Sequence, residues 1–315
     1  MSVAGLLSQL LEIAIAIALA PLLTGWVNQW RAWLQNRSAP PLWQPYLVLH
    51  KLFNKESMVA DHASRLFRTA PYVVFGCMVL ACSIIPTLST DLPLAPAADA
   101  IALVGLFALA RVFISLAAMD VGTAFGTLGA RREMLIGFLA EPALLMVLFS
   151  ASLISSSTSL TTIVDTLAHR ELVIYPGLAF AGVAFVMVSL AENARVPVDN
   201  PATHLELTMI HEALILEYSG RHLALIEWAA SLKLFAYSCI GLALFFPWGV
   251  ASASEPLAML LALPVLVLKL ATGGFLLALL ETLSAKMRIF RVPEFLGTAF
   301  LFSVMAMLVH LLLNR

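Results

Sequence analysis

Long apolar runs alternate with short polar stretches along almost the whole of this 315-residue chain. A run of about 20 apolar residues is long enough to cross a bilayer as an α-helix. The pattern predicts eight such helices, near residues 4–26, 71–90, 99–119, 134–155, 173–192, 223–247, 257–281 and 294–313. We therefore expect an all-α, polytopic membrane protein of about eight transmembrane helices, forming a single integral membrane domain over residues 1–315.

Lysine and arginine are distributed unequally between the two sides of this predicted bundle. The connections near residues 27–70, 120–133, 193–222 and 282–293 hold thirteen of them: Arg31, Arg37, Lys51, Lys55, Arg65, Arg68, Arg131, Arg132, Arg195, Arg221, Lys286, Arg288 and Arg291. The other side has only Arg170 and Arg315. Because cytoplasmic loops are enriched in these residues, we predict that the four connections are cytoplasmic. Both termini would then be non-cytoplasmic, in a multi-pass protein of the cell (inner) membrane.

Within the first cytoplasmic connection, Trp43–Phe53 is apolar with aromatic and basic flanks. Two interpretations stay open for it: an amphipathic helix at the membrane interface, or a plain connecting loop.

Composition excludes several classes of protein and of binding site. The chain is 61% hydrophobic and 12% charged, which excludes an ordinary soluble domain. Its net charge of −1 gives no basic surface for nucleic acid. The three cysteines, Cys77, Cys82 and Cys239, lie in apolar runs and form no CxxC pair. They are expected to be buried packing residues, so no iron–sulfur, zinc or other metal site is predicted in this chain.

Residues 191–220 are the most informative stretch, because five carboxylates lie between two apolar spans. They are Glu192, Asp199, Glu206, Glu212 and Glu217. A membrane protein has to solvate such groups or use them, so the segment indicates either proton or ion traffic or a solvated loop. Thr203 and Glu206 have the spacing of a helix capping box, which would give Glu206 a structural role instead.

Ionisable residues also occur inside the predicted spans. Glu141 precedes Pro142 in the fourth span, where a missing backbone hydrogen bond can open a polar pocket. This carboxyl could carry a proton, or it could be a structural partner of Arg111 in the third span, where an unpaired arginine would be costly.

The sixth and seventh spans carry four more charged residues. Lys233 and Lys269 lie within these spans, with Glu227 and Glu281 near their cytoplasmic ends. A buried Lys233 could exchange protons. Alternatively, its long side chain could extend out of the membrane core to the interface with water. The second arrangement is the one we expect for Glu281.

Four ordered segments resemble the subunit 1 family of respiratory complex I, and most closely its relatives in group 4 nickel–iron hydrogenases of the formate hydrogenlyase and hydrogenase-4 type. They are Arg37–Glu56, Gly129–Glu141, the pair AENARVPVDNP and LEYSG within residues 191–220, and LETLSAKMRIFRVPEFLG at residues 280–297. The resemblance covers nearly the whole chain. It implies an eight-span subunit that anchors a soluble electron-transfer arm to a membrane arm.

The resemblance also implies roles for individual residues. The family places proton-path carboxylates at the positions of Glu141, Glu192, Asp199, Glu206, Glu217 and Glu227, and basic partners at those of Arg131 and Arg195. To these we add Lys233 as a proton-path residue and Arg111 as a charge partner. No catalytic or cofactor-binding residue is predicted in this chain. Iron–sulfur clusters and a NiFe centre are expected in partner subunits.

Departures from complex I bear on the choice of function. The first loop has Ala39-Pro40 for Gly-Pro and Val48 for Asp, while Ala202 and His204 replace two acidic positions. These changes argue against a quinone site. The favoured function is a non-catalytic membrane anchor and proton-path (or ion-path) subunit of an oxidoreductase complex. Its partners would be hydrogenase-like large and small subunits, an iron–sulfur subunit, antiporter-like membrane subunits and the lipid bilayer.

Three other functions remain open. One is the quinone-site subunit of an NADH:quinone oxidoreductase. Another is a stand-alone secondary transporter, which would often show internal repeats; we find none in this sequence. The last is a purely structural scaffold whose carboxylates only form salt bridges.

Overall fold

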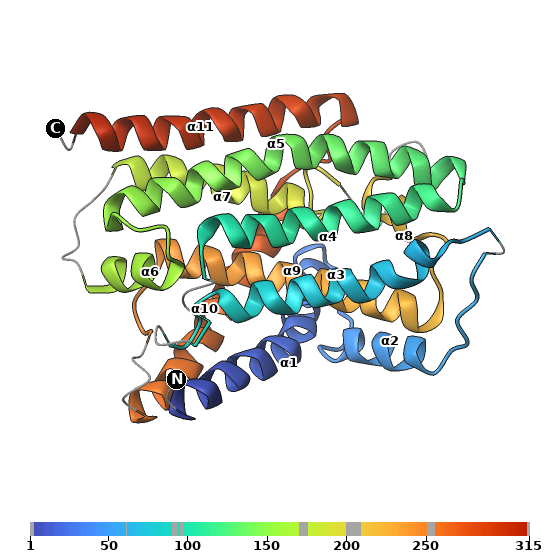
Figure 1. The fold of residues 1–315 in the computed structure, drawn as a ribbon, viewed down its shortest axis with the longest axis horizontal. Coiled ribbons are helices and arrows are strands. Elements are labelled where there is room, and N and C mark those ends of the chain that lie inside the picture. Colours follow the sequence, from blue (N-terminus) through green and yellow to red (C-terminus); the bar gives the residue numbers. More distant parts are fainter. Residues whose placement is uncertain are drawn as a thin grey trace.

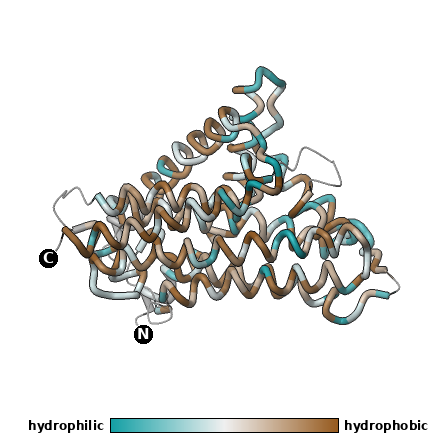
Figure 2. Tube along the Cα trace, turned by 90° about the horizontal axis from the view of Figure 1, so that it is seen from above, coloured by the Kyte–Doolittle hydropathy of each residue, from teal (hydrophilic) through white to brown (hydrophobic). Residues whose placement is uncertain are grey.

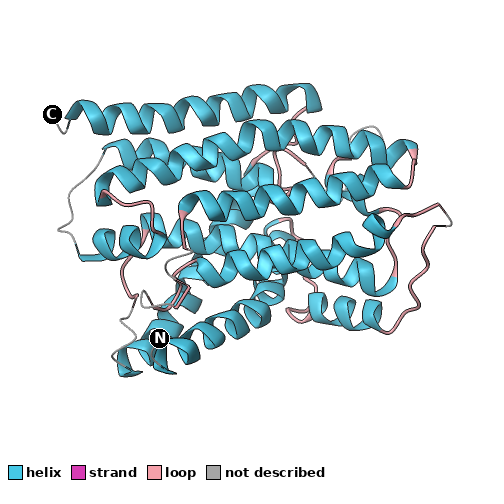
Figure 3. Ribbon diagram, in the orientation of Figure 1, coloured by secondary structure: helices cyan, strands magenta, loops and turns pink. Residues whose placement is uncertain are grey.

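A computed structural model describes residues 3–60, 62–89, 93–94, 98–169, 176–199, 209–250 and 256–313. These residues form α1 (Val3–Leu34), α2 (Gln44–Phe53), α3 (Arg65–Ile84), α4 (Ala100–Asp120), α5 (Ala124–Ser155), α6 (Leu160–His169), α7 (Pro176–Glu192), α8 (His211–Ile215), α9 (Gly220–Phe245), α10 (Pro256–Leu283) and α11 (Val292–Leu313), with a short 3-10 turn, η2 (Ile289–Arg291). Figure 3 shows helices and loops, and no strand in the described parts of the chain.

Seven of these helices are long and apolar enough to cross a membrane: α1, α3, α4, α5, α9, α10 and α11. The shorter apolar helix α7 corresponds to the remaining predicted span. Its 17 residues are at the lower limit for a bilayer-spanning helix. The all-α, polytopic fold predicted from the sequence is confirmed.

The long helices run roughly side by side in one bundle (Figure 1). From one edge to the other, α11 packs on α5 and α7, α5 on α4, α4 on α3, α3 on α9, α9 on α1, and α1 on α10. Both termini lie at the end of the bundle that carries α6, and α2 and α8 lie toward the opposite end. Figure 2 shows apolar residues along the helices, with many of the polar residues in the connections.

Several element boundaries differ from those predicted. Helix α1 continues to Leu34, and α5 begins at Ala124 and passes through Pro142 without interruption. Both helices therefore extend into stretches predicted as cytoplasmic loops. The residues Trp43–Phe53 form a helix from Gln44 onward, so the plain-loop interpretation was wrong. The ten-residue helix α6 was not predicted; it is shorter than a membrane span, and its hydropathy signal is correspondingly weak.

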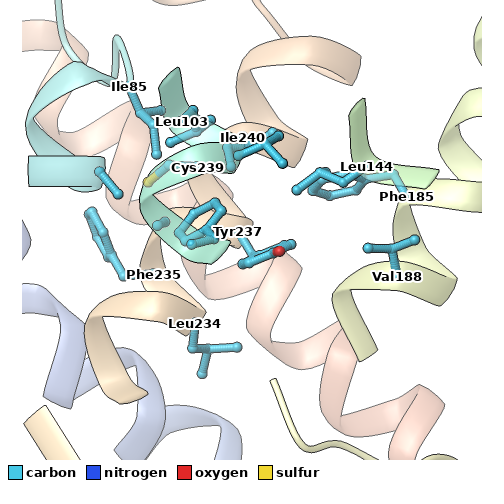
Figure 4. Close-up of a cluster of buried hydrophobic side chains, with 14 of the residues drawn as sticks. Ile85, Leu103, Leu144, Phe185, Val188, Leu234, Phe235, Tyr237, Cys239 and Ile240 are labelled. Atoms are coloured by element: carbon cyan, nitrogen blue, oxygen red, sulfur yellow. The ribbon is translucent and has the colours of Figure 1, made fainter. Parts of the chain in front are cut away.

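The core lies where α3, α4, α5, α7 and α9 meet. Tyr237 of α9 is at its centre, stacked on Phe107 with ring centroids 4.9 Å apart and near Phe185 at 6.2 Å. Figure 4 shows Tyr237 among buried apolar side chains, including Leu144 and Ile240. The predicted packing role of the cysteines is confirmed, since Cys77, Cys82 and Cys239 are buried and free.

The LEYSG segment joins α8 to α9 and holds the loop that follows α2. Tyr218 stacks on Phe67, and its hydroxyl donates to the Phe67 carbonyl at 3.0 Å. Ser219 Oγ donates to the Met58 carbonyl and accepts from the Met58 N–H, at 2.7 and 2.8 Å. Gly220 has φ +53°, a conformation that other residues adopt only with strain. The segment therefore fixes residues 57–58 over the end of α9.

Candidate functional site

A buried ion cluster centred on Arg111 lies inside the bundle. The Arg111 guanidinium, on α4, pairs with three carboxylates: Glu133 and Glu141 on α5, and Glu192 at the end of α7. Its Nε lies 3.2 Å from Oε1 of Glu133. Arg111, Glu133 and Glu192 are each at least 95% buried, with exposed fractions of 4, 3 and 2%. The sequence prediction that Arg111 pairs with Glu141 is confirmed.

A glycine makes room for this arginine. An added Cβ at Gly137 of α5 would meet Cδ of Arg111 at 2.7 Å and Cζ at 2.9 Å. The guanidinium therefore passes against the α5 backbone, between Glu133 and Glu141, which lie one turn to either side of Gly137. A side chain at this position would push Arg111 away from its carboxylates.

Lys233 adds a second cation to the cluster. Its Nζ lies 2.8 Å from Oε2 of Glu192. Three carboxylates thus face two fixed cations, which leaves one excess negative charge inside a bundle that spans the membrane. Such a charge is costly in a low-dielectric interior unless it is paired, solvated or neutralised by a proton.

His211 connects this cluster to the turn after α7. It is the first residue of α8, and its Nε2 lies 3.2 Å from Oε2 of Glu133. On the other side of the ring, Nδ1 lies 3.4 Å from Oδ2 of Asp199. Asp199 in turn pairs with Lys286, whose Nζ is 3.7 Å from Oδ1. The ionisable groups therefore form one chain from Lys286 to Lys233.

This series of ionisable groups borders a cavity of about 200 Å³. Most of its wall is apolar, from α3, α4, α8 and α9. Its ionisable lining residues are Arg111, Glu133, Glu192, His211, Glu212, Glu227 and Lys233. Since one water occupies about 30 Å³ in the liquid, the space suits a small group of waters better than a ligand of drug size, which needs at least ~300 Å³.

A separate ion pair fixes the turn after α7 to α1 and α10. Glu281, which is 4% exposed, pairs with Arg195 at 3.1 Å and with Arg31 at 3.5 Å. The expectation that Glu281 reaches the membrane surface was wrong. Two arginines from distant parts of the chain enclose it, and only the tertiary structure brings them there. Arg195, predicted as a charge partner of the acidic path, pairs with Glu281.

The other predicted site residues are less closely connected. Glu227 lies on the cavity wall, whereas Glu217 is exposed in the turn before α9. Arg131 is exposed on α5 and makes no ion pair within the described chain, while the adjacent Arg132 donates to the Met209 carbonyl at 2.8 Å. Glu206 and the predicted Thr203 cap lie outside the described residues.

Two buried acids and one histidine were missed from the sequence. Glu133 was read only as part of a motif, although it follows Arg132 in an otherwise apolar helix. Glu12, in α1, is 2% exposed and accepts backbone N–H groups of Leu88 and Ser89 at 3.1 and 2.8 Å. His211 was given no role from the sequence. In each case the residue is an ionisable group within or beside an apolar run, and this position could have indicated that it is buried.

The comparisons with known proteins fit this geometry. Residues 7–312 match the family described as NADH dehydrogenase. The chain belongs to that family, which includes subunit 1 of complex I. It is 33% identical to formate hydrogenlyase subunit 4 of Escherichia coli (strain K12) over 94% of this chain and 96% of that protein. It is also 33% identical to hydrogenase-4 component C of the same organism, over 89% of this chain and 87% of that one.

A solved structure shows the same fold. It is a chain of the membrane-bound sulfane sulfur reductase, an archaeal respiratory membrane complex, with a TM-score of 0.85. The match covers 97% of this chain and 99% of that one at 20% identity. The homologues are subunits of multisubunit complexes, which supports a membrane subunit of a redox complex for this family member.

The arrangement is suited to moving protons. Its groups are carboxylates, an imidazole and a lysine, all of which can gain or lose a proton, with a permanently charged arginine at the centre. No group of three or more His, Cys, Asp or Glu residues that could hold a metal ion occurs in the described ranges.

Proposed function

We propose that this chain is the membrane-anchor and proton-path subunit of a hydrogenase complex of the formate hydrogenlyase type. The observation that carries the proposal is the continuous series Lys286–Asp199–His211–Glu133–Arg111, which continues to Glu141, Glu192 and Lys233. It begins in the connection before α11 and ends inside the bundle. A soluble arm docked at that connection would thus contact one end of an ionisable chain.

Partner subunits complete the proposed complex. The hydrogenase-like large and small subunits and an iron–sulfur subunit would carry the iron–sulfur clusters and the NiFe centre. Antiporter-like membrane subunits would continue the path. Glu141 supports this extension because 29% of its side chain is exposed, in a pocket between α4, α5 and α11 that is otherwise apolar.

A quinone-site function is the second candidate, and the cavity beside the Arg111 cluster favours it. A quinone ring needs an apolar space with a few polar groups, which describes the wall of this cavity. Its volume of about 200 Å³ and the excess of charged groups make water the better fit.

The test uses the chain in its native complex. A tagged copy is purified from its own membranes in mild detergent, and partner subunits are identified by mass spectrometry. We expect a hydrogenase large subunit among them. The complex is then reconstituted in liposomes, and proton movement is followed with a pH-sensitive dye during viologen-linked hydrogenase turnover.

In this assay Glu192→Gln should lower proton movement per electron at least about tenfold, because the buried path loses a proton-binding group. Glu294→Gln is the matched control, since Glu294 is an exposed glutamate in the first turn of α11. Unchanged proton movement in Glu192→Gln would contradict the proton path. Quinone-dependent turnover in place of hydrogenase activity would favour the second candidate, and recovery of the chain alone would favour a transporter.

A further inference from the structure

His211 occupies an unusual place between two acids. Its ring faces Asp199 with Nδ1 at 3.4 Å and Glu133 with Nε2 at 3.2 Å. Only the doubly protonated imidazolium has N–H groups at both nitrogens. A neutral ring would leave one nitrogen without a proton against a carboxylate.

The two acids are both buried, but they have different neighbours. Asp199 faces Lys286, whose side chain is 23% exposed, in the connection before α11. Glu133 is 3% exposed and pairs with Arg111 inside the bundle. His211, with 24% of its side chain exposed, lies between these environments. Ion pairs run from one end of this series of groups to the other through His211.

We propose that His211 passes protons between the Asp199–Lys286 corner and the buried carboxylates around Arg111. This inference rests on the proposed proton-path function and names the residue that controls access to the path. A ring protonated at Nε2 accepts a proton at Nδ1 from the Asp199 side. The imidazolium then gives its Nε2 proton to Oε2 of Glu133. The ring is then neutral and protonated at Nδ1. Exchange of that proton for one at Nε2, through water in the adjacent cavity, restores the first tautomer, so no net charge stays on His211 after each transfer.

The receiving atom is suited to this transfer. Oε2 of Glu133 and Nε2 of His211 are both buried, and neither has a well-formed hydrogen bond within the described chain. They face each other at 3.2 Å. Glu133 uses its other oxygen for Arg111, so Oε2 is the oxygen that faces the ring.

The charged groups around His211 determine when it is protonated. Glu133 faces it from α5 and Asp199 from the turn after α7, while Lys233 acts from α9. Arg132 on α5 is near Asp199, Arg111 on α4 is paired with Glu133, and Glu212 is the next residue of α8. Burial alone lowers the pKa of His211, but the two carboxylates outweigh it and raise the pKa above its ordinary value.

Contacts other than the ring also hold α8 in place. Arg132 Nη1 donates to the Met209 carbonyl at 2.8 Å, immediately before α8. Gly129 of α5 lies against Ala213 and Ile210, where an added Cβ would be 2.8 Å from the Ala213 Cβ. These contacts should keep the segment in position when the imidazole is removed. We therefore expect variants at His211 to fold and assemble.

The experiment is chemical rescue in the reconstituted complex. His211→Ala should lower proton movement per electron at least about tenfold, because it removes the proton carrier, while viologen-linked hydrogenase turnover by the partner subunits persists. Added imidazole should restore much of the proton movement, with a pH dependence that follows the added base. The cavity of about 200 Å³ beside His211 has room for it.

Three further variants make the result decisive. His211→Arg keeps a positive charge but does not release a proton, so it should remain impaired. His211→Gln gives a second neutral replacement should the alanine variant fail to assemble. His50→Gln, an exposed histidine on α2, is the matched control and should behave like the unmodified complex.

The outcomes separate this inference from the proposed function. Normal proton movement and an unchanged pH profile in both His211→Ala and His211→Gln would overturn the His211 assignment, while a loss in Glu192→Gln would still support the path. Full recovery in His211→Arg would show that charge alone matters and would also overturn the assignment. An unmodified complex that moves no protons would overturn the proposed function itself.

Discussion

Arg111 on α4 and Glu192 at the end of α7 form an ion pair in which both residues are almost completely buried, with exposed fractions of 4 and 2%. Arg111 also binds Glu133 and Glu141 of α5, so one guanidinium ties three helices together. Buried ion pairs add little to stability relative to apolar packing, but removing one partner leaves an uncompensated charge. The cluster is therefore both a structural joint and the centre of the proposed path.

Replacing Arg111 with Gln should lower the free energy of unfolding by about 3–5 kcal/mol, since buried carboxylates lose their cation. The measurement is the denaturation midpoint of the purified complex in detergent. Arg131→Gln is the matched control, because Arg131 is an exposed arginine on α5 and its loss should cost less than about 0.5 kcal/mol. Equal destabilisation by the two variants would show that the cluster does not hold the helices.

A second prediction concerns the space that Gly137 leaves for Arg111. Gly137→Ala should destabilise the chain by about 1–3 kcal/mol, as expected for an overpacked site. It should also impair proton movement, because the added methyl group displaces the guanidinium. Gly105→Ala is the control: Gly105 lies on α4 with nothing within 4 Å of an added Cβ. That variant should be neutral or slightly stabilising, and a similar loss in both variants would contradict the steric explanation.

The LEYSG segment gives a third prediction. Gly220→Ala forces a side chain into a backbone with φ +53° and toward the carbonyls of Lys55 and Glu56, at 2.9 and 2.8 Å. We expect faster protease cleavage within residues 54–60, because the contacts that fix this loop are lost. Limited proteolysis followed by mass spectrometry measures this directly. Gly76→Ala in α3, where an added Cβ meets nothing within 4 Å, should leave the cleavage rate unchanged.

The raised pKa of His211 predicts a pH-dependent α8. Its stabilising contribution is fully present below its unfolded pKa of about 6.5 and is lost as pH rises through the higher folded value. Hydrogen exchange in residues 209–215, corrected for the intrinsic rate, should therefore increase on the alkaline side of neutrality. In His211→Gln this extra pH dependence should disappear. Protection in the unmodified chain that increases with pH would have the wrong sign and contradict the assignment.

The length of the apolar runs was sufficient to predict the bundle. Each predicted span coincides with a described helix because a bilayer requires long apolar segments whose backbone groups are satisfied internally. The pairing of Arg111 with Glu141 could also be foreseen, since charges at that depth need partners. Motif resemblance led to the correct family, which depends on local residue order rather than on packing.

Only the tertiary structure decided which charges meet. Arg195 and Glu281 are far apart in the sequence, and their pairing depends on how α7 and α10 end beside each other. The pairing of Glu133 with His211 likewise depends on the packing of α8 against α5, and their positions in the sequence do not indicate it. A sequence fixes how apolar each helix is and where its charges lie along the axis. Helix rotation and neighbour choice then determine whether a carboxylate faces lipid, water or an arginine, and these depend on long-range packing.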